Sequence, residues 1–321
     1  MVSSKKYSVI IRCYNEEKHI GRLLSGLLAQ SLPPDEILVV DSGSTDVTLS
    51  IASRFPVKII HVRKEEFSFG KSLNIGCQNA RNDFLVFASA HVYPVYTSWA
   101  DEILKPFDNA NTALVYGKQR GNEATKFSER QVFKKWFPDT VLVPQRHPFC
   151  NNANAAIRRE LWEKYPFNEQ LTGLEDLGWA KTITEKNYDI QYEPKAVVIH
   201  VHDETYQQIY NRYYREALAL KKIYPQEKFG RREFIKLFCS NVYMDMACAW
   251  EERVFFKSFA GIIMFRWMQF TGTYRGFTDS YTKESILKNR FYYPPQQRAP
   301  GDKEEPQEEK IDYSKMDVHH V

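Results

Sequence analysis

The chain has 321 residues, of which 43% are hydrophobic, 26% charged and 14% aromatic. This length and composition allow a packed core in one large domain or two ordinary ones, and they exclude disorder as a description of the whole chain. The formal net charge of +4 argues against a protein that mainly coats nucleic acid. The five scattered cysteines predict neither a disulfide framework nor a zinc module, and a reducing, cytoplasmic setting explains them most simply.

The N-terminal residues MVSSKKYSVII enter a strand-like run without the apolar stretch of a signal peptide. No uncharged apolar run reaches the roughly 18 residues that a membrane-spanning helix requires. We therefore expect a protein that is neither secreted by that route nor inserted into a bilayer as a helix.

The first third of the chain alternates short apolar runs with segments of helical periodicity, which is typical of βαβ units around a parallel sheet. Between the first two strands, leucines and one isoleucine recur at helical spacing over residues 20–28, and Asn15 is placed to cap that helix. The expected strands are Tyr7–Cys13, Ile37–Asp41, Val57–Val62 and Phe84–Ala88.

After about residue 110 the order changes, with isolated strands at 113–117 and 196–200 and a helix near 175–186. Residues 204–290 are expected to be mostly helical, and the Pro, Gln and Glu bias after Tyr293 predicts a solvated tail. We thus expect three regions: a catalytic domain over 1–225, a helical aromatic and basic extension over 226–292, and a disordered tail over 293–321.

Ligands of an open parallel sheet bind beyond the carboxyl ends of its strands, and here those ends are polar. They carry the segments Arg12–Glu16, Asp41–Ser44, His61–Arg63 and Ser89–His91. Each residue alone is also explained as an ordinary cap or turn residue, but four polar ends at one edge favour a ligand site.

Several familiar motifs are absent from the sequence. It has no G-x-x-x-x-G-K-[ST] loop, no G-x-G-x-x-G after the first strand, no G-x-S-x-G and no H-E-x-x-H. What remains is a nucleotide site that works without a glycine-rich phosphate cradle.

A resemblance appears in the run VIIRCYNEEKHIGRLLSGLLAQSLPPDEILVVDSGSTDVTLSIA, and it continues in FSFGKSLNIGCQNARNDFLVFASAHVYP, FCNNANAAIRRELW and TGLEDLGWAKTITEKNYDIQYEPKAVVIHVH. In order and content these segments resemble family 2 glycosyltransferases over about residues 5–225. Within that family, the segments VDSGSTD and SAH resemble those of the rhamnosyltransferase-like branch, whose members build bacterial surface polysaccharides.

The resemblance implies an α/β, Rossmann-like A-type glycosyltransferase fold with a central, mostly parallel sheet and a C-terminal helical extension. It also implies an inverting enzyme that moves a sugar from a nucleotide diphosphate sugar, with dTDP-rhamnose or a UDP-sugar as candidates, to a hydroxyl of a saccharide or lipid-linked acceptor. The implied contacts to the nucleotide sugar are Arg12, Asn15, Glu16, Asp41, Ser42, Lys71, Asn74, Ser89 and His91. Of these, Asp41 and Ser42 suit a base or ribose, while Arg12 and Lys71 suit phosphate oxygens.

Displacement at a sugar carbon needs a general base near the acceptor hydroxyl. The family pattern places it at Asp176 in Gly173-Leu174-Glu175-Asp176, with Glu175 as an acceptor-sugar or base-orienting neighbour. A carboxylate that only stabilises a helix N-terminus is the alternative. The resemblance also places Asn154 on the acceptor side, although turn formation explains the neighbouring Asn151 and Asn152 equally well. We add Trp179 as a residue that could stack on a sugar, although core packing explains it better.

The chain departs from the wider family where most members carry Asp-x-Asp for a divalent metal, because it has Ser89-Ala90-His91. We expect His91 and His202 to flank the diphosphate, either sharing a cation or donating hydrogen bonds. Imidazole suits Mn²⁺ better than Mg²⁺, which prefers oxygen, so the need for either cation stays open. Two unrelated imidazoles are the alternative.

Residues 204–277 interleave aromatic with basic side chains, as an amphipathic segment on an anionic membrane does. The same composition is compatible with RNA binding, but no RNA-binding module is recognisable and we expect no nucleic-acid partner. Packing onto the catalytic domain is the other alternative. We expect peripheral contact at the inner face of the cell membrane, where a lipid-linked acceptor would lie.

Two other functions compete with this prediction. A catalytically silent saccharide-binding protein on the same fold would explain the missing Asp-x-Asp. A nucleotidylyltransferase also begins with a nucleotide-binding βαβ unit, but the chain lacks the glycine-rich, basic loop after the first strand.

Overall fold

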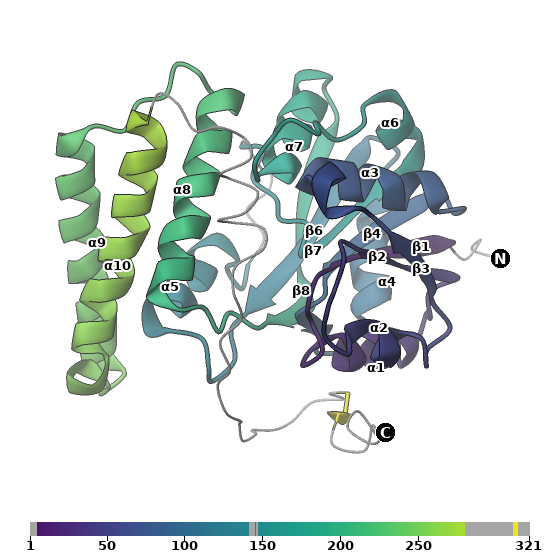
Figure 1. The fold of residues 1–321 in the computed structure, drawn as a ribbon, viewed down its shortest axis with the longest axis horizontal. Coiled ribbons are helices and arrows are strands. Elements are labelled where there is room, and N and C mark those ends of the chain that lie inside the picture. Colours follow the sequence, from purple (N-terminus) through teal and green to yellow (C-terminus); the bar gives the residue numbers. More distant parts are fainter. Residues whose placement is uncertain (1–4, 141–144, 146, 280–310, 314–321) are drawn as a thin grey trace.

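The protein consists of one mixed eight-stranded sheet with helices on both faces and three long helices beside it (Figure 1). The computed structural model describes residues 5–140, 145, 147–279 and 311–313. The first half of the chain forms β1 (Tyr7–Cys13), α1 (Ile20–Leu28), β2 (Glu36–Asp41), α2 (Thr48–Ala52), β3 (Lys58–His61), η1 (Lys64–Glu66), α3 (Phe69–Asn79), β4 (Phe84–Ser89), β5 (Val92–Pro94), α4 (Trp99–Leu104), η2 (Lys105–Asp108) and β6 (Thr112–Arg120).

The second half contributes fewer strands and the longest helices. It forms α5 (Phe127–Trp136), β7 (Asn154–Arg158), α6 (Arg159–Lys164), α7 (Glu175–Glu185), β8 (Asp189–His200), α8 (Tyr206–Ile223), α9 (Arg231–Glu251) and α10 (Phe255–Thr278). The βαβ pattern of the first third is confirmed, and the helices expected after residue 204 are present through Thr278.

The strand order is β3-β2-β1-β4-β7-β6-β8-β5. Strands β1 to β4 pair in parallel, while β7 runs antiparallel to both of its neighbours and β5 antiparallel to β8. The sheet is therefore mixed, with its parallel half at the N-terminal end of the chain.

The core has two layers, one on each face of the sheet. On one face α1 and α4 pack Leu23, Leu24 and Trp99 against β1 and β2. On the other face α3, α6 and α7 bury Leu73 and Trp162, among others. Strand β1 is covered from both sides, which explains its near-continuous apolar run.

Helices α8, α9 and α10 stand beside the sheet, and α10 lies between the other two (Figure 1). Two glycines allow α10 to approach α8 closely: a Cβ on Gly272 would lie 2.5 Å from the Tyr210 carbonyl oxygen, and one on Gly276 2.6 Å from that of Tyr214. A buried ion pair between Arg266 and Asp245, at 2.8 Å, joins α10 to α9.

The expected disordered tail needs one correction. Residues 311–313 pack beside β5, because Ile311 donates its N–H to Val95 (3.2 Å) and the Tyr313 hydroxyl donates to the Pro94 carbonyl (2.7 Å). The Tyr313 ring also meets Tyr93 edge to face. The rest of the predicted tail lies outside the described residues.

Candidate active site

Side chains predicted from the strand ends meet at the carboxyl edge of the parallel strands. The guanidinium of Arg12, near the end of β1, pairs with Glu175 at the start of α7, with Nη1 and Oε1 2.7 Å apart. After β4, His91 Nδ1 lies 2.8 Å from Glu16 Oε1. These contacts bring the loops after β1 and β4 together, and they join Arg12 to the start of α7, 163 residues further along the chain.

Asp176 sits in the first turn of α7, and its carboxylate is held by backbone donors. Oδ2 accepts from the Asn152 N–H at 3.0 Å, and Oδ1 accepts from the Leu177 N–H at 2.8 Å. Burial, followed by the neighbouring Glu175 carboxylate, raises the pKa of Asp176 from 3.8 to about 7. A carboxyl with such a pKa changes protonation state near neutral pH, which a general base requires.

Glu175 is buried, and its role follows from its partner. Arg12 lies between the Glu175 carboxylate and the ring of Phe69, whose centroid is 4.8 Å from the guanidinium carbon. Arg215 of α8 approaches the same ring at 4.7 Å. Glu175 therefore fixes the Arg12 head group and also raises the pKa of Asp176 through its charge.

Asp41 and Ser42 shape the turn after β2. The Asp41 carboxylate accepts from the backbone N–H groups of Gly43 (3.0 Å) and Ser44 (3.2 Å) and is 1% exposed. The Ser42 hydroxyl donates to the Cys13 carbonyl at 3.2 Å. Gly43 has a φ of +91°, a left-handed conformation that favours glycine.

Asn15 does not cap the first helix, contrary to the sequence prediction. It adopts a positive φ of 55°, and its side-chain oxygen accepts from the Thr45 N–H at 2.8 Å. Helix α1 begins only at Ile20, without a side-chain cap. Asn15 instead ties the loop after β1 to the loop after β2, because a short amide can satisfy a distant N–H and also tolerate left-handed backbone.

Lys71 lies in the first turn of α3, whose N-terminus is capped by the Ser68 hydroxyl. Its ammonium is 3.8 Å from Glu66, and about a third of its side chain is exposed. Gly70 is required beside it, because a Cβ there would lie 2.5 Å from the Asn168 carbonyl oxygen. Lys71 is thus an accessible cation on a closely packed helix start.

The Asn74 side chain forms hydrogen bonds in the protein interior and does not face the candidate site. Its amide oxygen accepts from Trp162 Nε1 and the Phe167 N–H, and its NH₂ donates to the Phe167 carbonyl and to Glu169. All four hydrogen-bonding positions of the amide are used, so no group is left for a nucleotide sugar.

Asn154 and Trp179 are likewise interior residues rather than acceptor contacts. Asn154 is fully buried, accepts from Trp99 Nε1, and donates to the carbonyls of Lys118 and Ala196. Trp179 is 3% exposed and donates to the Tyr165 carbonyl. Ser89, also predicted for the nucleotide sugar, is half-buried at the end of β4.

Three histidines lie together at the ends of β4 and β8: His200 is the last residue of β8, while His91 and His202 follow β4 and β8 by two residues. His202 Nε2 is 2.9 Å from His200 Nε2, and the ring of His91 stacks on that of His200 with centroids 5.0 Å apart. Burial lowers the pKa of His200 well below its ordinary value. Burial opposes protonation of His91 as well, but the Glu16 carboxylate outweighs it and raises the pKa of His91.

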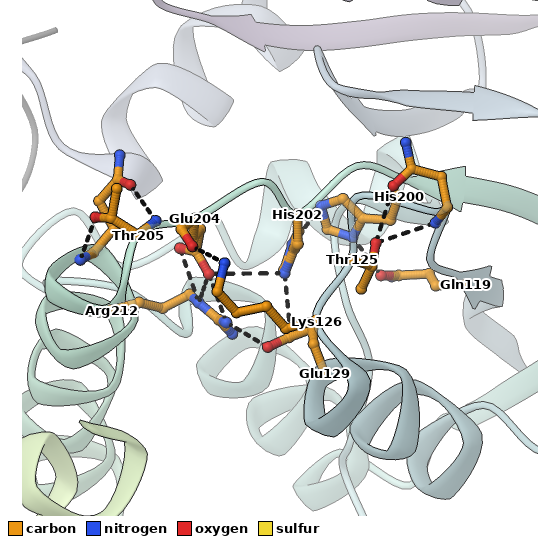
Figure 2. Close-up of polar contacts among 11 residues, drawn as sticks. Gln119, Thr125, Lys126, Glu129, His200, His202, Glu204, Thr205 and Arg212 are labelled. Atoms are coloured by element: carbon orange, nitrogen blue, oxygen red, sulfur yellow. Dashed lines mark hydrogen bonds and ion pairs between the residues drawn. The ribbon is translucent and has the colours of Figure 1, made fainter. Parts of the chain in front are cut away.

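Polar residues around these histidines were missed by the sequence reasoning (Figure 2). His200 Nδ1 lies 2.7 Å from Gln119 Oε1, and His202 Nδ1 lies 3.0 Å from Glu129 Oε1. Arg212 of α8 pairs with Glu129 at 2.8 Å and with Glu204 at 2.7 Å. Burial alone would raise the pKa of Glu129, but Arg212 and His202 outweigh it and lower the pKa to about 2.

A signal for His200 was present in the sequence, since residues two apart on an extended segment point to the same side. Glu129, on α5, and Arg212, on α8, gave no such signal. They lie near the histidines because the Phe133 ring of α5 stacks on His200, with centroids 5.8 Å apart, and because Arg212 of α8 pairs with Glu129.

Two groups of side chains in the described part of the chain could hold a metal ion. In each, the ligand atoms lie within 4.8 Å of one another: His91, His200 and His202 form one, and Glu129, His202 and Glu204 the other. In the second group Arg212 already occupies both carboxylates. The three imidazoles are therefore the donor set that fits a cation better.

Residues 8–165 match the family model described as Glycosyl transferase family 2. An O-antigen chain rhamnosyltransferase of Salmonella anatum is 29% identical over 196 residues, which cover 58% of this chain and 62% of that protein. Another, from Salmonella typhimurium, is 24% identical over 222 residues, covering 65% of this chain and 70% of that protein. The match thus covers less than two thirds of the length of the Salmonella anatum protein.

Solved structures share the fold. A mannosyltransferase from Pyrobaculum calidifontis, in complex with GDP-Man and Mn²⁺, superposes with a TM-score of 0.61 over 87% of this chain and 89% of that chain, at 18% identity. Residues 1–349 of TarS from S. aureus, in complex with UDP-GlcNAc, superpose with a TM-score of 0.53 over 84% of this chain and 90% of that chain, at 18% identity.

The sheet, its flanking helices and these neighbours define an A-type glycosyltransferase fold, as the sequence predicted. Residues 8–165 form a glycosyltransferase family 2 domain, and rhamnosyltransferases of O-antigen chains are among the relatives of the chain.

Proposed function

We propose that the protein transfers a sugar from a nucleoside diphosphate sugar to a hydroxyl group, with inversion at the anomeric carbon. The observation that carries this proposal is Asp176: its pKa is raised to about 7, and two backbone N–H groups fix its carboxylate. In the reaction Asp176 accepts the proton of the acceptor hydroxyl while that oxygen bonds to the anomeric carbon. The bond from that carbon to the diphosphate breaks, and its electron pair leaves with the nucleoside diphosphate.

Other residues at the same edge serve binding. Asp41 and Ser42 shape the turn that would face the base and ribose, while the cations Arg12 and Lys71 would attract the diphosphate. Arg12 is held by Glu175 and is therefore ordered before any ligand arrives. A divalent cation held by His91, His200 and His202 would neutralise charge on the leaving group.

The names of the relatives support a proposal for the donor and the acceptor. Those names include O-antigen chain rhamnosyltransferases and poly(ribitol-phosphate) β-N-acetylglucosaminyltransferases, which favours a role in surface polysaccharide synthesis. We propose dTDP-rhamnose or a UDP-sugar as the donor and a saccharide or lipid-linked saccharide as the acceptor.

A thermal-shift screen of nucleotide sugars with and without Mn²⁺ tests the binding step, because a ligand of the native state raises its stability. The donor it identifies is then assayed for release of the nucleoside diphosphate with purified chain and with Asp176→Asn. Turnover that Asp176→Asn abolishes supports the enzyme. A stabilising nucleotide sugar without turnover would instead support the saccharide-binding alternative.

We also propose that the outer side of α9 and α10 contacts the inner face of the cell membrane. This hairpin surface carries most of the exposed large apolar side chains among the described residues: Ile235, Leu237, Tyr243, Met244, Trp250, Phe256, Phe259, Met264 and Trp267. The exposed cations Lys236, Arg253 and Lys257 lie among them. Aromatic side chains beside basic ones suit the boundary of an anionic leaflet.

No helix in the described ranges combines the length and apolarity needed to cross a bilayer. Flotation with vesicles of phosphatidylglycerol and phosphatidylethanolamine tests the surface contact. The double substitution Trp250→Ser and Phe256→Ser should abolish flotation, whereas Val47→Ser, at an exposed apolar side chain on α2's N-terminal side, should leave it unchanged. Equal flotation of all three proteins would contradict the assignment.

A further inference from the structure

Residues 311–313, late in the chain, pack against two elements from its first third, α1 and β5. Ile311 is 7% exposed and donates its N–H to the Val95 carbonyl oxygen at 3.2 Å. The Tyr313 hydroxyl donates to the Pro94 carbonyl oxygen at 2.7 Å. Both acceptors are backbone groups at the end of β5, the strand that closes one side of the sheet order.

Helix α1 leaves room for the Tyr313 side chain. Gly26 lies at the contact, and a Cβ on it would lie 2.2 Å from the Tyr313 hydroxyl oxygen. Glycine is a poor helix former, so its place within α1 is explained by this close approach. The Arg22 guanidinium lies 5.0 Å from the Tyr93 ring centroid and 6.0 Å from that of Tyr313, and the two rings meet edge to face with centroids 5.1 Å apart.

The sequence before this segment singles out the same side chains. Residues 294–310 contain no aromatic residue and no Ile, Leu, Val or Met, so they offer little apolar area to bury. Ile311 and Tyr313 are the first such residues after Tyr293. The structure places both against the sheet edge and leaves Asp312, between them, exposed. The contact is therefore made by the residues that gain most from it.

The two elements that Tyr313 joins both lead into the candidate site. Ahead of α1, the Glu16 carbonyl oxygen accepts from the Ile20 N–H at 2.9 Å, so the loop with Glu16 is continuous with the helix. His91 directly precedes β5. The side chains of Glu16 and His91 meet at 2.8 Å, and that distance depends on how α1 lies relative to β5.

We propose that Tyr313 is a positioning residue for the candidate site. It packs against Arg22 and Tyr93 and so fixes α1 relative to β5. The loops that precede these elements then hold Glu16 and His91 at their contact distance. The role of this positioning in sugar transfer rests on the proposed function, whereas the docking of residues 311–313 does not.

Docking within one chain needs only a weak intrinsic affinity. A tethered segment has an effective concentration of about 1 mM, so a Kd of about 0.1 mM for the free peptide would keep roughly 90% of the chains docked. The contact is thus reversible, and one substitution should release it.

Hydrogen exchange of the full chain, measured by mass spectrometry, tests this positioning without any need for turnover. In Tyr313→Ala we expect exchange at least about tenfold faster over residues 16–26 and 91–96, because local opening becomes easier. Tyr313→Phe keeps the ring and loses only the hydrogen bond to Pro94, so its exchange should be intermediate. Leu28→Ala, at an exposed side chain of the same helix, is the control and should leave residues 91–96 unchanged.

Gly26→Ala tests the same contact from the side of α1. Alanine is the better helix former, so the helix persists while the Tyr313 hydroxyl has to leave its place. We expect the acceleration seen in Tyr313→Ala, and no further acceleration when both substitutions are combined, because each removes one shared contact. A peptide of residues 306–316, PQEEKIDYSKM, at about 1 mM should restore slow exchange in Tyr313→Ala but not in Gly26→Ala.

With the donor identified, Tyr313→Ala should raise the donor KM about tenfold and leave the acceptor KM within about twofold, since misplacement by about 1 Å can cost as much as 10²-fold. The peptide should reverse this change, which it would not do for a chain that had simply lost stability. Unchanged exchange in Tyr313→Ala, additive effects of the two substitutions, or faster exchange with an unchanged donor KM would each overturn the proposal. If the unsubstituted chain turns over no donor, the proposed function fails, while the exchange rates still decide whether Tyr313 holds these loops.

Discussion

The acid side of the pH–rate profile should report Asp176 directly. With its pKa raised to about 7, the carboxyl is half ionised at neutral pH, so kcat/KM should fall about tenfold for each pH unit below that point. An ordinary aspartate would place this decline near 3.8. The measurement is nucleoside diphosphate release at subsaturating donor between pH 5 and 9.

Glu175→Gln should move this decline to lower pH. The Glu175 charge is, after burial, the next cause of the raised pKa of Asp176, and its removal also leaves Arg12 free to favour the ionised carboxylate. Removing a nearby like charge should lower the midpoint by about one pH unit or more. Glu175→Asp is the control, because it keeps the charge and should keep the midpoint near 7.

The raised pKa of Asp176 also makes the stability of the fold depend on pH. Between about pH 4 and 7 the folded chain holds a proton that the unfolded chain releases, so stability falls as the pH rises through this window. The difference between 3.8 and about 7 corresponds to at most about 4 kcal/mol. Urea unfolding at pH 5 and pH 8 should show a smaller loss for Asp176→Asn than for the unsubstituted chain.

Either of two results would refute this reasoning. One is a midpoint in Glu175→Gln that coincides with that of Glu175→Asp. The other is an Asp176→Asn variant that keeps turnover within a few-fold, since a positioned base contributes about 10²- to 10⁴-fold.

Three further predictions concern stability. Asp245→Ala leaves the buried Arg266 without its partner and should cost about 3–5 kcal/mol in urea unfolding, whereas Asp245→Ala combined with Arg266→Met should recover much of that loss. Asn154→Ala removes the hydrogen-bond partner of the Trp99 indole and of two backbone carbonyls, so it should lower the melting temperature. A change in acceptor KM without loss of stability would contradict the assignment of Asn154 to the core. Gly272→Ala should destabilise the chain by about 1–3 kcal/mol through contact with Tyr210, and an unchanged unfolding curve would disprove that close approach.

The sequence predicted the parallel half of the sheet well because local signals define it. Each strand there is a short apolar run, and polar residues follow it directly, so the pattern of residues alone places Arg12, Asp41 and His91 at one edge. The antiparallel strand β7 was not predicted. Its residues Asn154–Arg158 form a five-residue run that reads as a turn followed by a helix.

The roles of the amides could not be predicted for a different reason. Asn74 and Asn154 have the residue type and position of ligand contacts, but their partners lie 36 to 95 residues away in the chain. Whether an amide faces a ligand or the core depends on which distant backbone groups need a hydrogen-bond partner. Only the packed structure defines that need.

The pairing of Arg12 with Glu175 has a consequence for how the protein is made. Because 163 residues separate the partners, a ribosome adding about 5–20 residues per second completes Arg12 roughly 8–30 s before Glu175. Strand β1 is therefore synthesised before Glu175, the ion-pair partner of its Arg12 side chain. His91 is likewise synthesised before its neighbours His200 and His202. The nascent chain completes β1 to β4 early, whereas Asp176 follows only with α7, and His200 and His202 follow only with the end of β8.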